Sequence, residues 1–204
     1  MKAFLALSRL IDSVNSVVGR AAAWLILVAV VVSAANALIR KLFSMSSNAW
    51  LELQWYLFGA VFLLTAGYTL LRNEHVRVDV LSQHFSPRTR IKIEIFGVLL
   101  FILPAAIVIM WLSWPIFVDA FIHNEQSSNA GGLIRWPAKL LIPVGFALLV
   151  AAAVSHLIKC VAYLLGLCAD PTQVADSESS ELQLADEISR IATQSERASP
   201  RGKS

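Results

Sequence analysis

Four long apolar runs dominate the pattern of hydrophobic and polar positions along the 204 residues of the chain. A helix needs roughly 20 apolar residues to cross the hydrocarbon core of a bilayer. A backbone inside hydrocarbon has no water to bond to, so each run must be helical. The pattern therefore predicts an all-α membrane protein with one transmembrane domain, 20–168, whose four helices lie at about residues 21–39, 53–71, 93–114 and 138–167.

The segments that flank these runs have different patterns. In residues 1–19 apolar positions recur at helical spacing with polar residues between them, which predicts an amphipathic helix in the cytoplasmic membrane interface. The apolar positions are Leu7, Leu10, Ile11, Val14, Val17 and Val18. Residues 169–204 are rich in Ser, Asp and Glu and hold too few apolar residues to bury a core, so we expect a disordered cytoplasmic tail.

A capping residue and a proline mark where the third helix begins. Ser86 suits an N-cap, and Pro87 suits the first turn of a helix, where a missing N–H costs nothing. Pro104 and Pro143 fall inside the third and fourth runs, where we expect tolerated kinks. The preceding loop contains RNEHVRVDV, residues 72–80, which we interpret as a short interfacial segment because a single strand has no sheet to join.

Composition and charge support a membrane protein. Hydrophobic residues make up 57% of the chain and charged residues 15%, whereas soluble domains carry about 45–50% and about 25%. Thirteen of the 17 Lys and Arg residues lie on the side that holds both termini, which places the termini in the cytoplasm. These residues flank the apolar runs, so the net charge of +3 indicates membrane topology and anionic lipid rather than nucleic acid.

The sequence lacks the residues that enzymes and cofactor-binding proteins need. A b-type haem within a bundle requires two histidine ligands, and only His156 lies in a predicted span. There is no Gly-rich phosphate-binding loop, no GxSxG and no HExxH. A metal site made of His75, Asp79 and His84 would lack a fourth ligand. We therefore expect no catalysis and no bound cofactor or metal.

The second apolar run is suited to contact with other helices. Its bulky residues are Trp55, Tyr56, Phe58, Phe62 and Leu63, and its small residues are Gly59, Ala60, Ala66 and Gly67. Small residues let helices approach closely, and we expect this surface to pack partly within the chain and partly on another membrane protein. Four spans leave little room for alternating access, which favours a scaffold. A membrane anchor of a redox complex and a self-contained small transporter remain alternatives.

The loop between the third and fourth runs, residues 115–139, combines a polar middle with Gly131 and Gly132 and then Arg135 and Trp136. The glycines permit a tight turn. Tryptophan suits the membrane interface, and arginine suits phosphate or carboxylate. The pattern fits either a simple re-entry turn or a docking surface for a partner outside the membrane.

Two segments of the sequence resemble the small permease subunit, of the DctQ type, of tripartite ATP-independent periplasmic (TRAP) transporters. The first is NAWLELQWYLFGAVFLLTAGYTLLRNEHVRVDVL, residues 48–81, which SPRTR follows at 86–90. The second is NEQSSNAGGLIRWPAKLLIPVGFALL, residues 124–149. In this order, and with four spans, the similarity covers about residues 20–167.

The resemblance implies a transporter of three parts. A soluble periplasmic protein captures an organic acid, a large membrane subunit carries it inward with sodium, and the small subunit scaffolds the large one in the bacterial inner membrane. On this basis we expect carboxylate uptake by symport, with no enzymatic activity in this chain. The residues expected to form the motif or to bind partners are Glu52, Gln54, Trp55, Arg72, Asn73, His75, Arg77, Asp79, Asn124, Glu125, Arg135 and Trp136.

Overall fold

The computed structural model describes residues 2–44, 47–72, 86–168 and 188. Its elements are all helical and follow one another as α1 (Lys2–Phe43), α2 (Asn48–Leu71), α4 (Pro87–Gly97), the π-helical turn η1 (Val98–Ile102), α5 (Leu103–Ile122) and α6 (Trp136–Leu164). Four helices are long and apolar enough to cross a membrane, with α4, η1 and α5 joined into one of them. The prediction of an all-α protein with four such helices is confirmed. The tail at 169–204 and the loop at 73–85 lie outside the described residues, apart from position 188.

The first helix extends beyond the membrane span predicted at residues 21–39. It runs from Lys2 to Phe43 without a turn and so includes nearly all of residues 1–19, which were predicted as an amphipathic interfacial segment. Its polar residues Ser8 and Asn15 are buried against the rest of the chain, whereas Leu10 and Val17 are exposed. A helix in water would show the opposite arrangement. The apolar side of this segment therefore faces away from the chain, and its place in a membrane interface stays a prediction.

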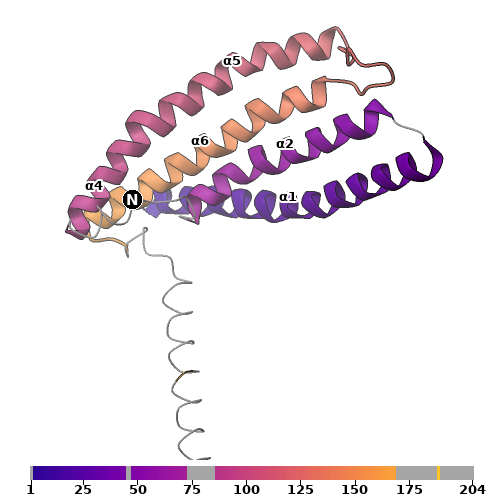
Figure 1. The fold of residues 1–204 in the computed structure, drawn as a ribbon. Helices are drawn as coiled ribbons and strands as arrows, with labels where there is room; N and C mark the ends of the chain where they lie inside the picture. The colour runs from indigo at the N-terminus through magenta and orange to yellow at the C-terminus, as the bar shows by residue number, and fades with distance from the viewer. Residues whose placement is uncertain (1, 45–46, 73–85, 169–187, 189–204) are drawn as a thin grey trace, which may run out of the picture.

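The third long helix begins and bends where its sequence indicates. Ser86 caps α4, because its side chain accepts a hydrogen bond of 3.4 Å from the Thr89 N–H, and Pro87 occupies the first turn. The wider turn η1 ends two residues before Pro104, and this proline has no N–H to donate to the carbonyl of Leu100 in η1. Figure 1 shows α4 and α5 following one arched path. By contrast, α6 continues as one helix through Pro143.

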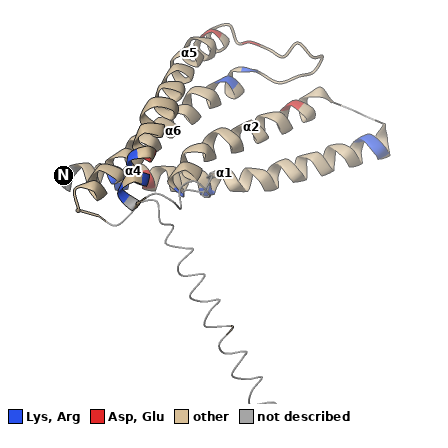
Figure 2. Ribbon diagram, turned by 60° about the vertical axis from the view of Figure 1, so that its left-hand side comes forward, with Lys and Arg blue, Asp and Glu red and all other residues tan. Residues whose placement is uncertain are grey.

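The helices form an open layer rather than a closed bundle. Figure 1 shows α5, α6, α2 and α1 side by side in that order. They spread apart at the hairpin end, where residues 125–135 connect α5 to α6, and converge at the N-terminal end. In the packing, α6 contacts α1, α2 and α5, which makes it the central helix. Most charged residues lie near the two ends of the layer (Figure 2).

The two edge helices contact their neighbours along narrow stripes of small residues. In α5 the buried residues are Ala106, Ser113 and Ala120, seven positions apart. In α1 the same spacing relates the buried Ala22 and Ala29. A seven-residue repeat keeps one stripe facing a neighbouring helix, and small side chains allow close approach where hydrocarbon provides no hydrophobic driving force.

Polar contacts connect the first part of α1 to the last part of α6, at the end of the layer that holds the N-terminus. The Ser155 hydroxyl donates a hydrogen bond of 2.6 Å to Asp12 and lies 2.7 Å from the Ser8 hydroxyl. The Lys159 ammonium lies 2.5 Å from the other oxygen of Asp12. On the side of α6 that faces α4, His156 Nε2 lies 3.3 Å from Glu94. Both acidic groups are thus directed into the protein and paired.

Substitution Lys159→Met is expected to lower the free energy of unfolding by about 1–3 kcal/mol, because it leaves the half-buried Asp12 carboxylate without its counter-ion. Unfolding in a fixed detergent measures the change. Adding Asp12→Asn removes the unpaired charge and should restore part of the stability. If the double variant lowers the free energy of unfolding by the sum of the two single effects, Asp12 and Lys159 are not coupled.

Candidate functional site

The connection between α5 and α6 forms a short hairpin, residues 125–135. Gln126 and Ile134 make an antiparallel bridge, and the Arg135 N–H donates a hydrogen bond of 2.9 Å to the Glu125 carbonyl. This pairing gives the connection a defined conformation. The hairpin is the element that brings the predicted residues Glu125 and Arg135 together.

The turn of the hairpin depends on its two glycines in different ways. Gly131 has φ +70°, a left-handed conformation in which side chains are disfavoured. The Gly132 N–H closes the turn with a hydrogen bond of 3.0 Å to the Asn129 carbonyl. A Cβ at Gly132 would lie 2.6 Å from the Ser127 hydroxyl and 2.8 Å from Glu52 Oε1. Gly132 thus leaves room for the carboxylate of α2.

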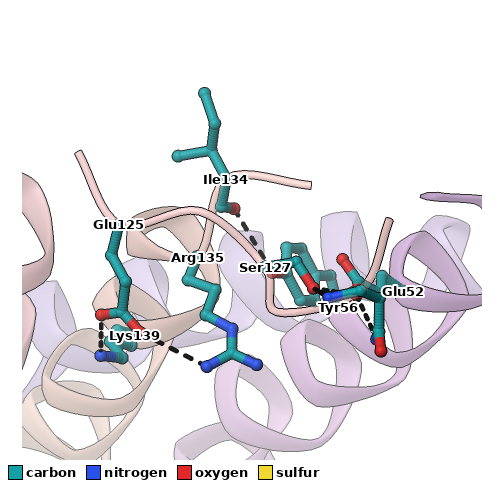
Figure 3. A network of polar contacts seen from close by, with 8 residues as sticks. Glu52, Tyr56, Glu125, Ser127, Ile134, Arg135 and Lys139 are labelled. Carbon is teal, nitrogen blue, oxygen red and sulfur yellow. Dashed lines mark hydrogen bonds and ion pairs between the residues drawn. The ribbon is translucent and has the colours of Figure 1, made fainter. Parts of the chain in front are cut away.

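Glu52 binds the hairpin to α2. Its carboxylate is buried, with 5% of the residue exposed. The Leu133 N–H donates to Glu52 Oε2 at 2.7 Å, and the Asn129 amide donates to Oε1 at 2.8 Å. The Ser127 hydroxyl also donates to Oε1 (Figure 3). Hydrogen bonds to an ionised acceptor are among the strongest in proteins and compensate the carboxylate for its lost hydration.

Two further residues of α2 bind the hairpin from the same face of the helix. The Asn48 amide donates to the Ala130 carbonyl at 2.9 Å, and the Tyr56 hydroxyl donates to the Ile134 carbonyl at 3.3 Å. Asn48, Glu52 and Tyr56 are spaced by four residues, so they share one side of α2. Asn48 was not identified from the sequence, although polar residues at this spacing in an otherwise apolar helix are a usable signal.

A second carboxylate connects the hairpin to α6. Arg135 Nη1 lies 3.4 Å from Glu125 Oε1, and Lys139 pairs with Glu125 Oε2. The hydrogen bond from Lys139 is the main reason that the pKa of Glu125 lies below its ordinary 4.5, with burial opposing and Arg135 assisting. Arg135 therefore meets a carboxylate, as its residue type indicated, and that carboxylate belongs to the same chain.

The other two predicted residues near the hairpin have structural contacts. Asn124 has φ 46° and ends α5 in a left-handed conformation that asparagine tolerates. The ring of Trp136, the first residue of α6, meets Phe121 of α5 edge to face at 5.4 Å between centroids. Both residues shape the junction between α5, the hairpin and α6.

Some of the bulky residues predicted on α2 pack against the rest of the chain, and the others are exposed. Tyr56 and Leu63 are half-buried. Trp55, Phe58 and Phe62 are exposed by 65%, 52% and 76%. We call these three residues the α2 aromatic stripe; their spacing of three and four places them on one face of the helix.

The remaining motif residues lie on α2 or beyond it. Gln54 is half-buried. Arg72 follows the last residue of α2, and its guanidinium lies 5.1 Å from the centroid of the Tyr68 ring. The predicted residues Asn73, His75, Arg77 and Asp79 lie outside the described residues. Glu52 and Arg72 are thus near opposite ends of α2 and do not share one site. The part of the chain that the structure describes contains no group of three or more His, Cys, Asp and Glu side chains suited to a metal ion.

Comparison with known families identifies the chain. A family model described as "Tripartite ATP-independent periplasmic transporters, DctQ component" matches residues 28–162, which is more than half of the sequence. The match includes both Glu52 and the hairpin that it binds. No curated protein and no solved structure matches the chain. The resemblance seen in the sequence is confirmed: the chain belongs to the DctQ family of tripartite ATP-independent periplasmic transporter components.

Proposed function

We propose that this chain is the small membrane subunit that scaffolds the large transport subunit of a TRAP transporter in the bacterial inner membrane. The transporter would take up an organic acid with sodium after delivery by a periplasmic binding protein. The observation that carries the scaffolding role is the exposed apolar surface. Within the described residues, the buried positions of each edge helix form a narrow stripe, and each residue of the α2 aromatic stripe is exposed by more than half. Such a surface suits contact with another membrane protein.

Gly59 supports the α2 aromatic stripe as the contact with the large subunit. A Cβ at Gly59 would meet nothing within 4 Å, so no close neighbour within the described residues explains this glycine. Glycine in a helix costs about 1 kcal/mol relative to alanine. A small residue beside bulky ones lets a second transmembrane helix approach closely. We therefore assign the stripe and Gly59 to a helix of the large subunit.

The hairpin supports a second contact, with the loaded binding protein. The excess of basic residues at the N-terminal end favours a topology in which the hairpin lies in the periplasm. Its hydrogen bonds to Glu52 hold the hairpin in one conformation. A preorganised loop loses less conformational entropy when it binds a partner. Ser128 and Gly131 at its turn are exposed and available for such a contact.

Trp55→Ala with Phe62→Ala is expected to reduce the amount of large subunit that co-purifies with a tagged chain by on the order of tenfold, because large aromatic anchors dominate interface energies. The matched control is Trp111→Ala with Phe101→Ala, which removes the same two residue types from the third long helix, where they are exposed by 76% and 65%. In proteoliposomes with the binding protein, the control should support sodium-dependent carboxylate uptake and the stripe variant should not.

Two results would contradict this assignment. If the stripe variant retains the large subunit and the control loses it, the interface lies on the third long helix, formed by α4, η1 and α5. If neither a large membrane subunit nor sodium-dependent uptake accompanies the wild-type chain, the scaffolding role itself is wrong.

A further inference from the structure

The first half of α1 arranges its side chains in three separate faces. Ser8, Asp12 and Asn15 face the interior, where Asp12 binds Lys159 and Ser155. A second face is apolar and exposed; it consists of Leu7, Leu10, Val14 and Val17. A third face carries Arg9 and Arg20, which are eleven residues apart. Because eleven residues make about three turns, the two arginines lie on one side of the helix.

The exposed charge on this segment is of one sign. Asp12 is the only acidic residue among the first 43 of the chain, and it is directed inward and paired with Lys159. At the same end, Glu94 of α4 is also directed inward, toward His156. Arg88 and Lys92 of α4 are exposed. Figure 2 shows most of the described Lys and Arg residues gathered at this end. Among the described residues, the exposed charge at this end is therefore cationic.

Both arginines extend in the same direction along the helix. Arg9 Nε donates to the Leu5 carbonyl at 3.4 Å, and Arg20 Nε donates to the Ser16 carbonyl at 3.2 Å. Each side chain reaches back one turn toward the N-terminus, as basic side chains do when they extend toward a membrane surface. Within the described residues neither guanidinium forms an ion pair with a carboxylate, so the terminal nitrogens of both can bind an anion.

We propose that residues 4–20 of α1 bind anionic phospholipid. The apolar face contacts acyl chains, and the guanidinium groups of Arg9 and Arg20 bind headgroup phosphates. The two arginines are separated by roughly 16 Å along the helix axis, so they bind two different headgroups. Since no exposed carboxylate of this segment is available for the amine of a zwitterionic lipid, the cationic face selects lipids with net negative charge.

The test titrates the full-length purified chain with phosphatidylglycerol or phosphatidylcholine in mixed micelles and follows the unfolding temperature. Phosphatidylglycerol should raise the Tm of the wild type more than phosphatidylcholine does. Arg9→Gln with Arg20→Gln should weaken the apparent affinity for phosphatidylglycerol by on the order of tenfold or more. Arg40→Gln with Lys41→Gln, at the opposite end of the same helix, should leave it unchanged. Arg9→Lys with Arg20→Lys should retain most of the binding, since lysine also binds phosphate.

Several outcomes would overturn the proposal. One is full phosphatidylglycerol binding by the double glutamine variant, and another is an equal loss in the variant of Arg40 and Lys41. Equal stabilisation by inorganic phosphate would show a free-anion site in place of a lipid site. If the glutamine variant fails to fold, the wild type still decides: lipid binding that is unaffected by raising the salt concentration contradicts recognition through charge.

Discussion

Substitution Glu52→Ala is expected to release the hairpin from α2 while the long helices stay folded. Three hydrogen-bond donors of the hairpin share this one carboxylate. Without it, the Leu133 N–H and the Asn129 amide have no acceptor on α2, whereas the small-residue contacts between helices are unchanged. Hydrogen–deuterium exchange should show amide exchange across residues 127–133 faster by on the order of tenfold or more.

Two variants act as controls for Glu52→Ala. Gln54→Ala changes a neighbouring polar residue for which no bond to the hairpin is described, and exchange in the hairpin should stay slow. Glu52→Gln keeps the shape and one acceptor but places an NH₂ group against donors, so it should give an intermediate result. Slow hairpin exchange in Glu52→Ala would show that Asn48 and Tyr56 alone hold the hairpin.

Substitution Gly67→Ala is expected to lower the free energy of unfolding by about 1–3 kcal/mol, as overpacking does in close-packed interiors. A Cβ at Gly67 would lie 2.9 Å from the Leu148 carbonyl oxygen of α6 and still closer to the Asn15 side chain of α1. The Leu148 oxygen belongs to the backbone, and Asn15 is held by a hydrogen bond of 3.1 Å to the Ile11 carbonyl. The Leu148 carbonyl cannot move away without shifting α6, and the Asn15 side chain can move away only by breaking its hydrogen bond.

Gly59→Ala makes the same chemical change eight residues earlier on α2. The space around that position is open, so we expect unchanged or slightly higher stability, with a gain of up to about 1 kcal/mol from helix propensity. Thermal unfolding of both variants in one detergent measures the difference. Equal melting temperatures would mean that α1, α2 and α6 do not meet at Gly67 as closely as described.

The helices could be predicted from the lengths of the apolar runs, but the extent of α1 could not. Arg20 marks the start of an apolar run, yet a charged residue does not end a helix, and Gly19 is used for close packing on Tyr68. An amphipathic helix in a membrane interface normally turns its polar side chains toward water. Ser8 and Asp12 contact Ser155 and Lys159 instead, and no pattern within α1 reveals that a distant helix supplies polar partners.

Three residues that the sequence singled out, Glu52, Glu125 and Arg135, make contacts that the sequence does not predict. Glu52 binds Ser127 and Leu133, which are 75 and 81 residues away in the chain. Such a contact depends on how α2 packs beside α6, and helical periodicity does not determine that packing. Local features were more predictable, as the N-cap Ser86 and the glycine turn of the hairpin show.

The residues of α5 are under two different kinds of evolutionary constraint, one for the buried stripe and one for the exposed positions. The buried positions recur every seven residues at Ala106, Ser113 and Ala120. These positions must stay small for the chain to fold. Positions between them, such as Trp111 and Leu112, are constrained only by what surrounds the protein. Members of the family can therefore change most of this helix to suit a new partner or lipid without redesigning their own fold.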